Sequence, residues 1–315
     1  MTFNESIAFL VDPQFQYNNP TSRIDDYFET ILRKFKEVLF NNKYCICLGD
    51  LTEFPVLDMA GLIAIISLLK KYKENGGTFY SLIGNHDIYN WNLSSINKAT
   101  LGLLNKLGLV TIIDNSGEIE NSLSEIDIKG WNIQCTSLKN PKENLVIAKQ
   151  DKSILIGHNY YAFERDKKHS LEYEDLKDLG YKYIFLGHDH QNYKPKIIEK
   201  STLYRSGNLS RGKAEVYNFD REIYYYQLDL NTDKVQSVKI DYKPAVEVFS
   251  LETVSRHNDT TPKYVYDMEE LMKNFKNKKT INISIKKMLE ENKEIPDRVV
   301  EFIKDCYEAC QLEFV

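Results

Sequence analysis

The sequence predicts an α/β fold in which helices lie outside packed sheets. Short apolar runs alternate with segments whose apolar residues recur at helical spacing, and alternating strand-like pairs follow from about residue 214 to 242. This order of elements is typical of layered α/β domains. The chain has 315 residues, 42% of them hydrophobic, which suffices for one large domain with a sizeable core and a smaller second domain.

Five strand-like runs share one property, because each of them ends at a polar cluster. In chain order the runs are 7–11, 44–48, 79–83, 153–156 and 183–186. The polar residues that follow them are Asp12 with Gln14, Asp50, Asn85 with His86, His158, and His188 with His190. Ligands collect at the carboxyl ends of strands in α/β sheets, and four of the six histidines lie in this set. The pattern therefore predicts one site built from five strand ends.

Three predicted helices separate these strands. Apolar residues recur at helical spacing over 24–39, which predicts an amphipathic helix. A largely apolar helix over 59–73 is stopped by Gly76-Gly77, and a shorter helix over 95–107 is closed by a glycine. Weak alternation over 110–134 predicts peripheral strands. The runs 223–228 and 235–240 have the alternation of antiparallel strands.

The character of the sequence changes after Lys243-Pro244. The segment 248–254 has the pattern of one more strand, and 268–312 is rich in Lys and Glu with two or three helical patterns. We therefore predict a domain boundary here, with a catalytic domain over 1–243 and a capping or partner-binding domain over 244–315.

Composition narrows the functional classes. The net charge of −5 gives no overall basic field for nucleic acid, although a local basic groove or a basic partner is compatible with it. Five irregularly spaced cysteines argue against a disulfide framework, and Cys45 and Cys47 are expected on one buried strand face. The start of the chain lacks a basic region, and no apolar run approaches the roughly 20 residues that span a bilayer. The sequence thus predicts a cytoplasmic protein without membrane contact.

The clustered residue types indicate a binuclear metal site. Mixed oxygen and imidazole donors suit manganese, iron or zinc, and the absence of cysteine disfavours a structural zinc. One carboxylate bridging two cations about 3.5–4 Å apart fits two-metal hydrolysis. Glycines precede Asp50, Asn85, His158 and His188, and we expect them to let the backbone turn sharply so that each side chain reaches inward.

These residues carry a specific resemblance. The blocks Asp12-Pro13-Gln14, 49–53 (GDLTE), 84–87 (GNHD), 157–158 (GH) and 187–190 (GHDH) occur in the order found in calcineurin-like metallophosphoesterases, within about the first 190 residues. The family has histidine where this chain has Gln14. The resemblance implies a four-layer α-β-β-α metallophosphoesterase sandwich, here with a small C-terminal α+β capping domain.

The resemblance also implies roles for individual residues. One metal would take Asp12, Gln14, Asp50 and His190. The other would take Asp50, Asn85, His158 and His188, so that Asp50 bridges. His86 would face the phosphate as a catalytic residue, stabilising charge or protonating the leaving oxygen, and Asp87 would orient His86.

Within the family, the segment 19–30 resembles SbcD-type DNA repair nuclease subunits, especially those carried by phages. It contains a P-x-x-R-x-D-D pattern opening a helix. This likeness implies two divalent ions, manganese first and iron or zinc as alternatives, DNA as substrate, an SbcC-like coiled-coil ATPase as partner, and a homodimer formed through 96–107. A loop beside the active site would bring Arg211, before Arg205, to a phosphate.

Two other functions compete with the nuclease. The first is a small-molecule nucleotide phosphodiesterase or phosphatase, because glutamine at the position of Gln14 also occurs in nucleotide-hydrolysing relatives. The second is a non-catalytic module that has lost a metal, against which the intact His86 and Asp50 argue. The helical patterns of the C-terminal segment favour the nuclease subunit, and the acidic pI of about 5.8 slightly favours the small-molecule enzyme.

Overall fold

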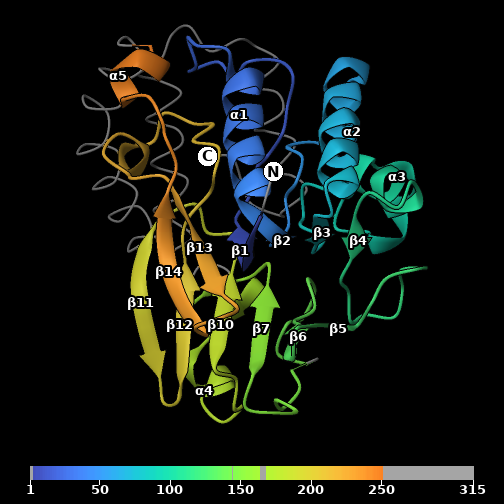
Figure 1. The fold of residues 1–315 in the computed structure, drawn as a ribbon. Helices are drawn as coiled ribbons and strands as arrows, with labels where there is room; N and C mark the ends of the chain where they lie inside the picture. Colours follow the sequence, from blue (N-terminus) through green and yellow to red (C-terminus); the bar gives the residue numbers. More distant parts are fainter. Residues whose placement is uncertain (1–2, 144, 164–167, 251–315) are drawn as a thin grey trace, which may run out of the picture. The chain divides into compact units, whose positions relative to one another are not determined.

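Two six-stranded sheets pack face to face in the computed structural model, which describes residues 3–143, 145–163 and 168–250 (Figure 1). The first sheet has the strand order β14-β13-β1-β2-β3-β4. Its strands are β1 (Asn4–Leu10), β2 (Asn42–Cys47), β3 (Thr78–Ser81), β4 (Thr111–Ile112), β13 (Tyr224–Asp229) and β14 (Lys234–Lys239). The strands β1 to β4 run parallel, and β13 and β14 form the predicted antiparallel pair, joined to β1 through β13.

The second sheet has the strand order β11-β12-β10-β7-β6-β5. Its strands are β5 (Glu125–Ile128), β6 (Trp131–Cys135), β7 (Ser153–Gly157), β10 (Tyr183–Leu186), β11 (Tyr193–Ile198) and β12 (Ser201–Arg205). The four inner strands are parallel, and each edge strand is antiparallel to its neighbour. A small third sheet pairs β8 (Tyr160–Tyr161) with β9 (Ser170–Leu171).

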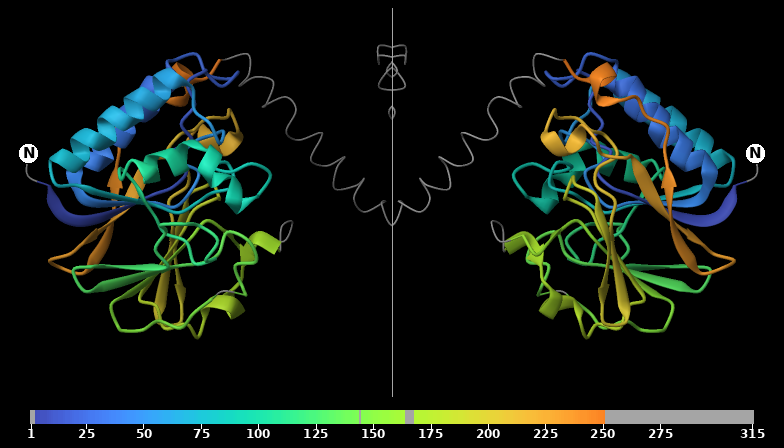
Figure 2. Two further views of the ribbon diagram at one scale, coloured as in Figure 1. Left: turned by 90° about the vertical axis from the view of Figure 1, so that its right-hand side faces the viewer. Right: turned by 90° about the vertical axis from the view of Figure 1, so that its left-hand side faces the viewer.

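Helices cover the outer face of the first sheet, as Figure 2 shows from two sides. The helical elements are α1 (Tyr27–Asn41), α2 (Met59–Glu74), η1 (Leu93–Lys98), α3 (Thr100–Lys106), α4 (Tyr173–Leu176), η3 (Val216–Asn218) and α5 (Ala245–Val248). Asp26 caps α1 by accepting a hydrogen bond from the Glu29 N–H, and Asp58 caps α2 in the same way. The outer face of the second sheet packs against the short α4 and its neighbouring loops.

Strand β1 shows why the central strands have near-continuous apolar sequences. Ile7 and Phe9 point into the core between the sheets, whereas Ala8 and Leu10 point into the core beneath the helices. A strand buried on both faces needs apolar residues at every position rather than at alternate ones. Cys45 and Cys47 of β2 both lie in the core beneath the helices, which confirms their predicted common face. The predicted layered α/β fold class is likewise confirmed.

The structure corrects the helix predicted over 95–107. It is divided at Ala99, whose backbone is extended, into the 3₁₀ helix η1 and the helix α3. The N–H of Thr100 donates to the Pro55 carbonyl at 2.7 Å, and the Thr100 hydroxyl accepts from the Leu57 N–H at 2.8 Å. The Thr100 N–H, which one continuous helix would use internally, is therefore bonded elsewhere. Together the two bonds attach α3 to the loop after β2.

The chain divides into two units, 1–254 and 255–315. Residues 244–250 belong to the first unit, in which the Ile24 N–H donates to the Val248 carbonyl and Phe249 forms a bridge with Arg23. Part of the strand predicted over 248–254, and almost all of the predicted second domain, lie outside the described residues, so the boundary near Lys243 stays a prediction. None of the helices in the described part of the chain is long and apolar enough to cross a membrane.

Candidate metal centre

The carboxyl ends of the parallel strands in both sheets meet at one place. Asp12, Asp50 and Asn85 follow β1, β2 and β3 of the first sheet. His158 and His188 follow β7 and β10 of the second sheet. Backbone hydrogen bonds extend the pairing into these loops, for example from the Gly187 N–H to the Gly157 carbonyl at 2.8 Å.

His158 lies at the centre of a cluster of metal-binding atoms. Its Nε2 is 3.1 Å from Asn85 Oδ1, 3.1 Å from His188 Nδ1 and 3.3 Å from Asp50 Oδ2. Donor atoms that each lie about 2.1 Å from one cation are about 3–3.5 Å apart, so this spacing fits a shared divalent ion. These are the four residues predicted for the second metal, and one ligand atom from each of Asp50, His158 and His188 lies within 4.8 Å of the others.

A backbone carbonyl sets the orientation of the His158 ring. Its Nδ1 lies 2.7 Å from the carbonyl oxygen of Leu48, and the side chain is buried. An N–H at Nδ1 that donates to this oxygen leaves the lone pair of Nε2 for a cation. The loop after β2 thus supplies both the candidate ligand Asp50 and the carbonyl that orients an imidazole from the other sheet.

Asp12 and His190, two members of the other predicted ligand set, lie close together. His190 Nε2 lies 3.5 Å from Asp12 Oδ2. This carboxylate oxygen is fully buried and has no hydrogen-bond partner among the described residues. Because a buried, unsatisfied carboxylate oxygen costs several kcal/mol, a cation at this position fits the residues present.

Gln14 is buried beside this set, but its amide has a different partner. Its Oε1 accepts a hydrogen bond from the Ser210 hydroxyl at 3.3 Å, and its backbone carbonyl accepts from the Tyr27 hydroxyl at 3.0 Å. Its backbone N–H donates to the Asp50 carbonyl at 2.9 Å. Ser210, which no sequence motif links to Gln14, therefore holds the amide oxygen.

His86 reaches the centre through both its backbone and its ring. Its N–H donates to Asp50 Oδ1 at 2.8 Å, and its Nδ1 lies 2.8 Å from the Glu53 carbonyl oxygen. The ring is thereby fixed with Nε2 available for substrate. Asp87, which is predicted to orient His86, has other partners in the structure, because its buried carboxylate accepts from the backbone N–H groups of Thr52 and Gly84. Asp87 joins two ligand-bearing loops, and Glu53 contacts the His86 ring.

Strained backbone marks the candidate ligands. Asp12, Gln14, Asp50 and His188 have φ values of 45°, 49°, 50° and 78°. Non-glycine residues in this left-handed region cost of the order of 1–3 kcal/mol each and gather at functional sites. The surrounding hydrogen bonds hold a conformation that the ligand positions require.

One of the four glycines before the candidate ligands has the turning conformation that was predicted, and at least two others have a different role. Of the four, only Gly49 has a left-handed φ, at 100°. A Cβ on Gly84 would overlap the carboxylate and the N–H of Asp50, and one on Gly187 would lie 2.8 Å from the Leu48 carbonyl oxygen. Close approach between loops, more than turning, excludes side chains at these two positions.

Burial and crowding shift the pKa values in opposite directions. Burial raises the pKa of Asp12 to about 8, although the His158 imidazole opposes it. Burial alone would raise the pKa of Asp50, but the facing imidazoles lower it below its usual range. Against burial, the two carboxylates raise the pKa of His158 to about 9, whereas burial lowers those of His188 and His190 to about 2 and about 4. Neutral His188 and His190 keep lone pairs for cations, whereas His158 must lose its Nε2 proton when it binds one.

One basic residue differs from expectation. Arg211, predicted to touch a phosphate, is 1% exposed, and its Nη2 donates to the Lys243 carbonyl, so it holds a loop instead. The exposed Lys213 lies nearby, and after burial its ammonium further lowers the pKa of His190. No motif marks Lys213, and only the fold brings it to the metal centre.

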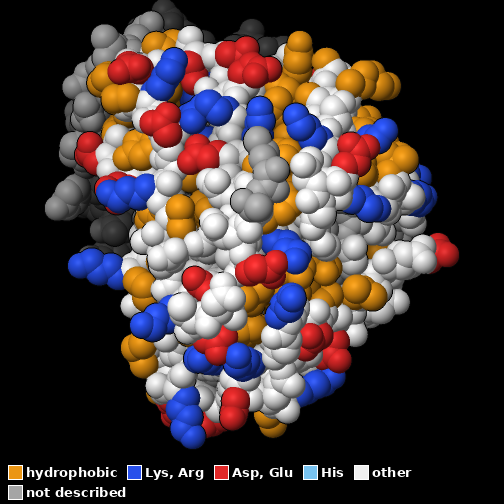
Figure 3. Space-filling model, viewed as in Figure 1, with side chains coloured by type: hydrophobic (Ala, Val, Ile, Leu, Met, Phe, Trp, Pro, Cys, Tyr) orange, Lys and Arg blue, Asp and Glu red, His pale blue; other side chains and the backbone are white. Residues whose placement is uncertain are grey.

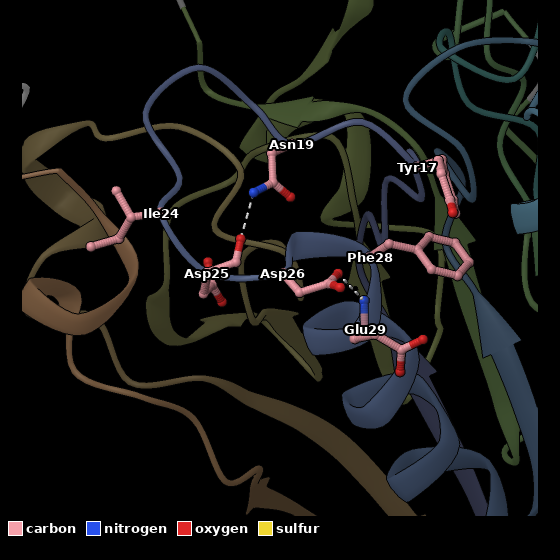
Figure 4. A pocket seen from close by; sticks show the side chains of 7 residues that line it. All are labelled: Tyr17, Asn19, Ile24, Asp25, Asp26, Phe28 and Glu29. Carbon is pink, nitrogen blue, oxygen red and sulfur yellow. Dashed lines mark hydrogen bonds between the residues drawn. The ribbon is translucent and has the colours of Figure 1, made fainter.

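A pocket of about 450 Å³ lies away from these residues, at the start of α1 (Figure 4). It is lined by Tyr17, Asn19, Ile24, Asp25, Asp26, Phe28 and Glu29. Asp25 and Asp26 already have local partners, because Asp25 accepts two 2.7 Å hydrogen bonds from Arg23 and Asp26 caps the helix. The P-x-x-R-x-D-D segment is thus built to start α1.

Comparison with known proteins identifies a family. The family model described as calcineurin-like phosphoesterase matches residues 7–192. No curated protein matches the chain.

Three solved structures match the chain at low similarity. A protein of Thermus thermophilus is 9% identical, with a TM-score of 0.45, covering 75% of this chain and 99% of its own. A hypothetical protein of the same organism is 10% identical, with a TM-score of 0.42 and coverages of 76% and 99%. A conserved uncharacterized protein of Streptococcus pneumoniae, a predicted phosphoesterase, is 8% identical, with a TM-score of 0.31 and coverages of 79% and 97%.

Proposed function

Because this chain belongs to the calcineurin-like phosphoesterase family, we propose that it is a two-metal phosphodiesterase acting on DNA, the nuclease subunit of an SbcCD-like repair and recombination complex. The observation that best supports hydrolase activity is the spacing of the candidate ligands. Side-chain atoms of Asn85, His188 and Asp50 all lie 3.1–3.3 Å from His158 Nε2. Two divalent ions, when bound, neutralise phosphate charge and lower the pKa of a water ligand. The mixture of imidazole and oxygen donors favours manganese, with iron and zinc as alternatives.

Asp50 and His86 have separate roles in the proposed reaction. Asp50 belongs to both predicted ligand sets, and its carboxylate accepts from the His86 N–H and lies beside His158, so it would link both metal positions to the catalytic histidine. With Nδ1 held by the Glu53 carbonyl, His86 Nε2 is free to stabilise charge on the phosphate or to protonate the leaving oxygen.

The surroundings of His86 support a large substrate. The His86 side chain is 34% exposed. Phe54, which follows Glu53 in the sequence, and Tyr89 are 61% and 45% exposed. An open rim of this kind leaves room for a polymer. On the face seen in Figure 3, basic and acidic side chains are interspersed in the described part of the chain, so DNA would be held mainly at the metal centre or with a partner's help.

Activity on a substrate panel tests this function. With Mn²⁺, the purified chain should cleave single- or double-stranded DNA and bis-p-nitrophenyl phosphate, and should leave mononucleotides intact. Asp50→Asn is the background control, since it should abolish turnover and lower metal content at both sites. A preference for mononucleotides over diesters would contradict the nuclease and favour a nucleotide phosphatase.

The partner proposal rests on the C-terminal segment, which lies outside the described residues. Its Lys/Glu-rich helical patterns and its lack of predicted ligands favour a protein-binding role. Truncation before Met268 should spare cleavage of bis-p-nitrophenyl phosphate and abolish binding of an SbcC-like ATPase. Loss of diester cleavage in a folded truncated protein would contradict the protein-binding role of this segment.

A homodimer through 96–107 would use Leu103 and Leu107, which are 40% and 50% exposed.

A further inference from the structure

Two stacked aromatic pairs lie against His188, one of the candidate metal ligands. Trp91 stacks on His169, with ring centroids 4.1 Å apart and an interplanar angle of 26°. Tyr160 stacks on Phe163, with centroids 4.4 Å apart and an angle of 24°. The Tyr160 ring lies 4.1 Å from the His188 ring, and the Trp91 ring approaches it edge-on at 6.4 Å.

The metal centre itself does not require these rings. His188 turns its Nδ1 toward His158, and its position follows from β10 and from its own N–H, which donates to Asp12. Trp91 lies in the loop after β3, whereas Tyr160 is in β8, Phe163 follows β8 and His169 directly precedes β9. The fold therefore brings one distant ring, Trp91, against a short segment that carries the other three.

Exposure and strain distinguish these rings from core aromatics. Phe9 and Phe185 stack at 3.7 Å in the core and are each 1% exposed, whereas Phe163 is 38% exposed and Trp91 and Tyr160 are partly exposed. Trp91 also has a left-handed φ of 59°. Residues held in this strained backbone region gather at active sites and ligand-binding elements, and Trp91 lies beside the candidate metal centre.

We propose that these rings form a stacking platform for a nucleobase attached to the phosphodiester at the metal centre. The inference rests on the proposed phosphodiesterase function and narrows its substrate to a diester with a base next to the scissile phosphate. Base–aromatic stacking contributes about 1–3 kcal/mol and tolerates every base, because each base has a π-face. Phe163 is the most exposed ring and is the one expected to meet the base.

Dinucleotide cleavage tests the platform in the full-length protein with Mn²⁺. The substrates are thymidylyl-thymidine and its two analogues with a single abasic sugar, on the 3′ or the 5′ side. The wild-type kcat/KM should fall about 5- to 150-fold when one particular base is removed, which corresponds to a stacking energy of about 1–3 kcal/mol. Phe163→Ala should lower kcat/KM for the intact dinucleotide by a similar factor, mainly through KM, and should show little further loss on that abasic analogue.

The controls separate the possible outcomes. Tyr17→Ala removes an aromatic ring that is 51% exposed in the pocket of Figure 4, and it should leave all three rates unchanged. Equal wild-type rates on intact and abasic substrates, or an equal loss on all three in Phe163→Ala, would overturn the platform. This result would leave the phosphodiesterase standing if bis-p-nitrophenyl phosphate is still cleaved, whereas no cleavage of any diester would overturn the proposed function. If Phe163→Ala does not fold, the wild-type comparison alone decides.

Discussion

Asp50 connects the residues of the centre more closely than any motif indicates. Its carboxylate accepts from the His86 N–H at 2.8 Å and lies 3.3 Å from His158 Nε2. Asn85 and His86 are adjacent in sequence, yet the Asn85 amide faces the metal-binding cluster while the His86 ring is held by Glu53. Neighbouring residues can therefore be tested for separate roles.

His86→Ala should lower turnover of bis-p-nitrophenyl phosphate by roughly 10²-fold or more while metal content is retained, because the lost group acts on the phosphate. Asn85→Ala is the matched comparison and should lower metal content. Metal analysis and steady-state kinetics on both variants check this. Equal loss of metal and activity in His86→Ala would make His86 a ligand.

Gln14→His should tighten the first metal site and lower the Mn²⁺ concentration needed for half-maximal rate, whereas Gln14→Ala should raise it. Imidazole is a stronger donor to these metals than an amide oxygen. In the wild type, Mn²⁺ titration should show two unequal affinities, with activity following the weaker one.

Ser210→Ala complements the Gln14 titration, because it removes the hydrogen bond that holds Gln14 Oε1. If Gln14 is a ligand, this variant should also alter the Mn²⁺ dependence. Identical Mn²⁺ curves for the wild type and both Gln14 variants would remove Gln14 from the ligand set.

The loops that follow β2 and β3 contact each other closely at the strand ends. The loop after β3 approaches the loop after β2 so closely that Gly84 has no room for a side chain beside Asp50. Asp87 reinforces this contact with hydrogen bonds to the Thr52 N–H at 3.2 Å and the Gly84 N–H at 2.9 Å. The position of Asp50 thus depends on both the loop after β2 and the loop after β3.

Gly84→Ala should displace Asp50, lower metal content and reduce stability by about 1–3 kcal/mol, the usual cost of overpacking. Gly76→Ala provides the control. Gly76 has a left-handed φ of 91°, but a Cβ there meets nothing within 4 Å, so this variant should lose some stability and keep its metals. Metal content and urea unfolding measure both effects. Full metal occupancy in a folded Gly84→Ala protein would contradict the loop contact.

At the scale of the whole first unit, the centre joins the two sheets. Asp12, Asp50 and Asn85 belong to the first sheet, and His158 and His188 belong to the second. Divalent ions bound here would connect both layers through their ligands. Folding and metal binding should therefore be coupled.

Mn²⁺ should raise the free energy of unfolding by about 2.7 kcal/mol when its concentration is about 100 times its Kd, because it binds the folded protein alone. Chelation should reverse this shift. Thermal or urea unfolding at several Mn²⁺ concentrations measures it, and Asp50→Asn should show no dependence on the metal. An unfolding midpoint that does not move with Mn²⁺ in the wild type would argue against ligands from both sheets.

The sequence alone determined the layered α/β class, most of the strands and the set of candidate ligands. This was possible because each ligand directly follows an apolar run that is buried on both faces, so composition marks the strand and the polar break marks its end. The edge hairpin β11–β12 was missed, because its exposed residues and Pro195 lack the pattern of a buried strand.

Only the tertiary structure decided which of these residues meet. His158 contacts Asn85 from 73 positions away, and Ser210 reaches Gln14 from 196 positions away. Glu53 rather than Asp87 orients His86, and Trp91 meets His169 beside His188. Spacing along the chain carries no information on such pairings, because they depend on how two sheets pack and on which loops then touch.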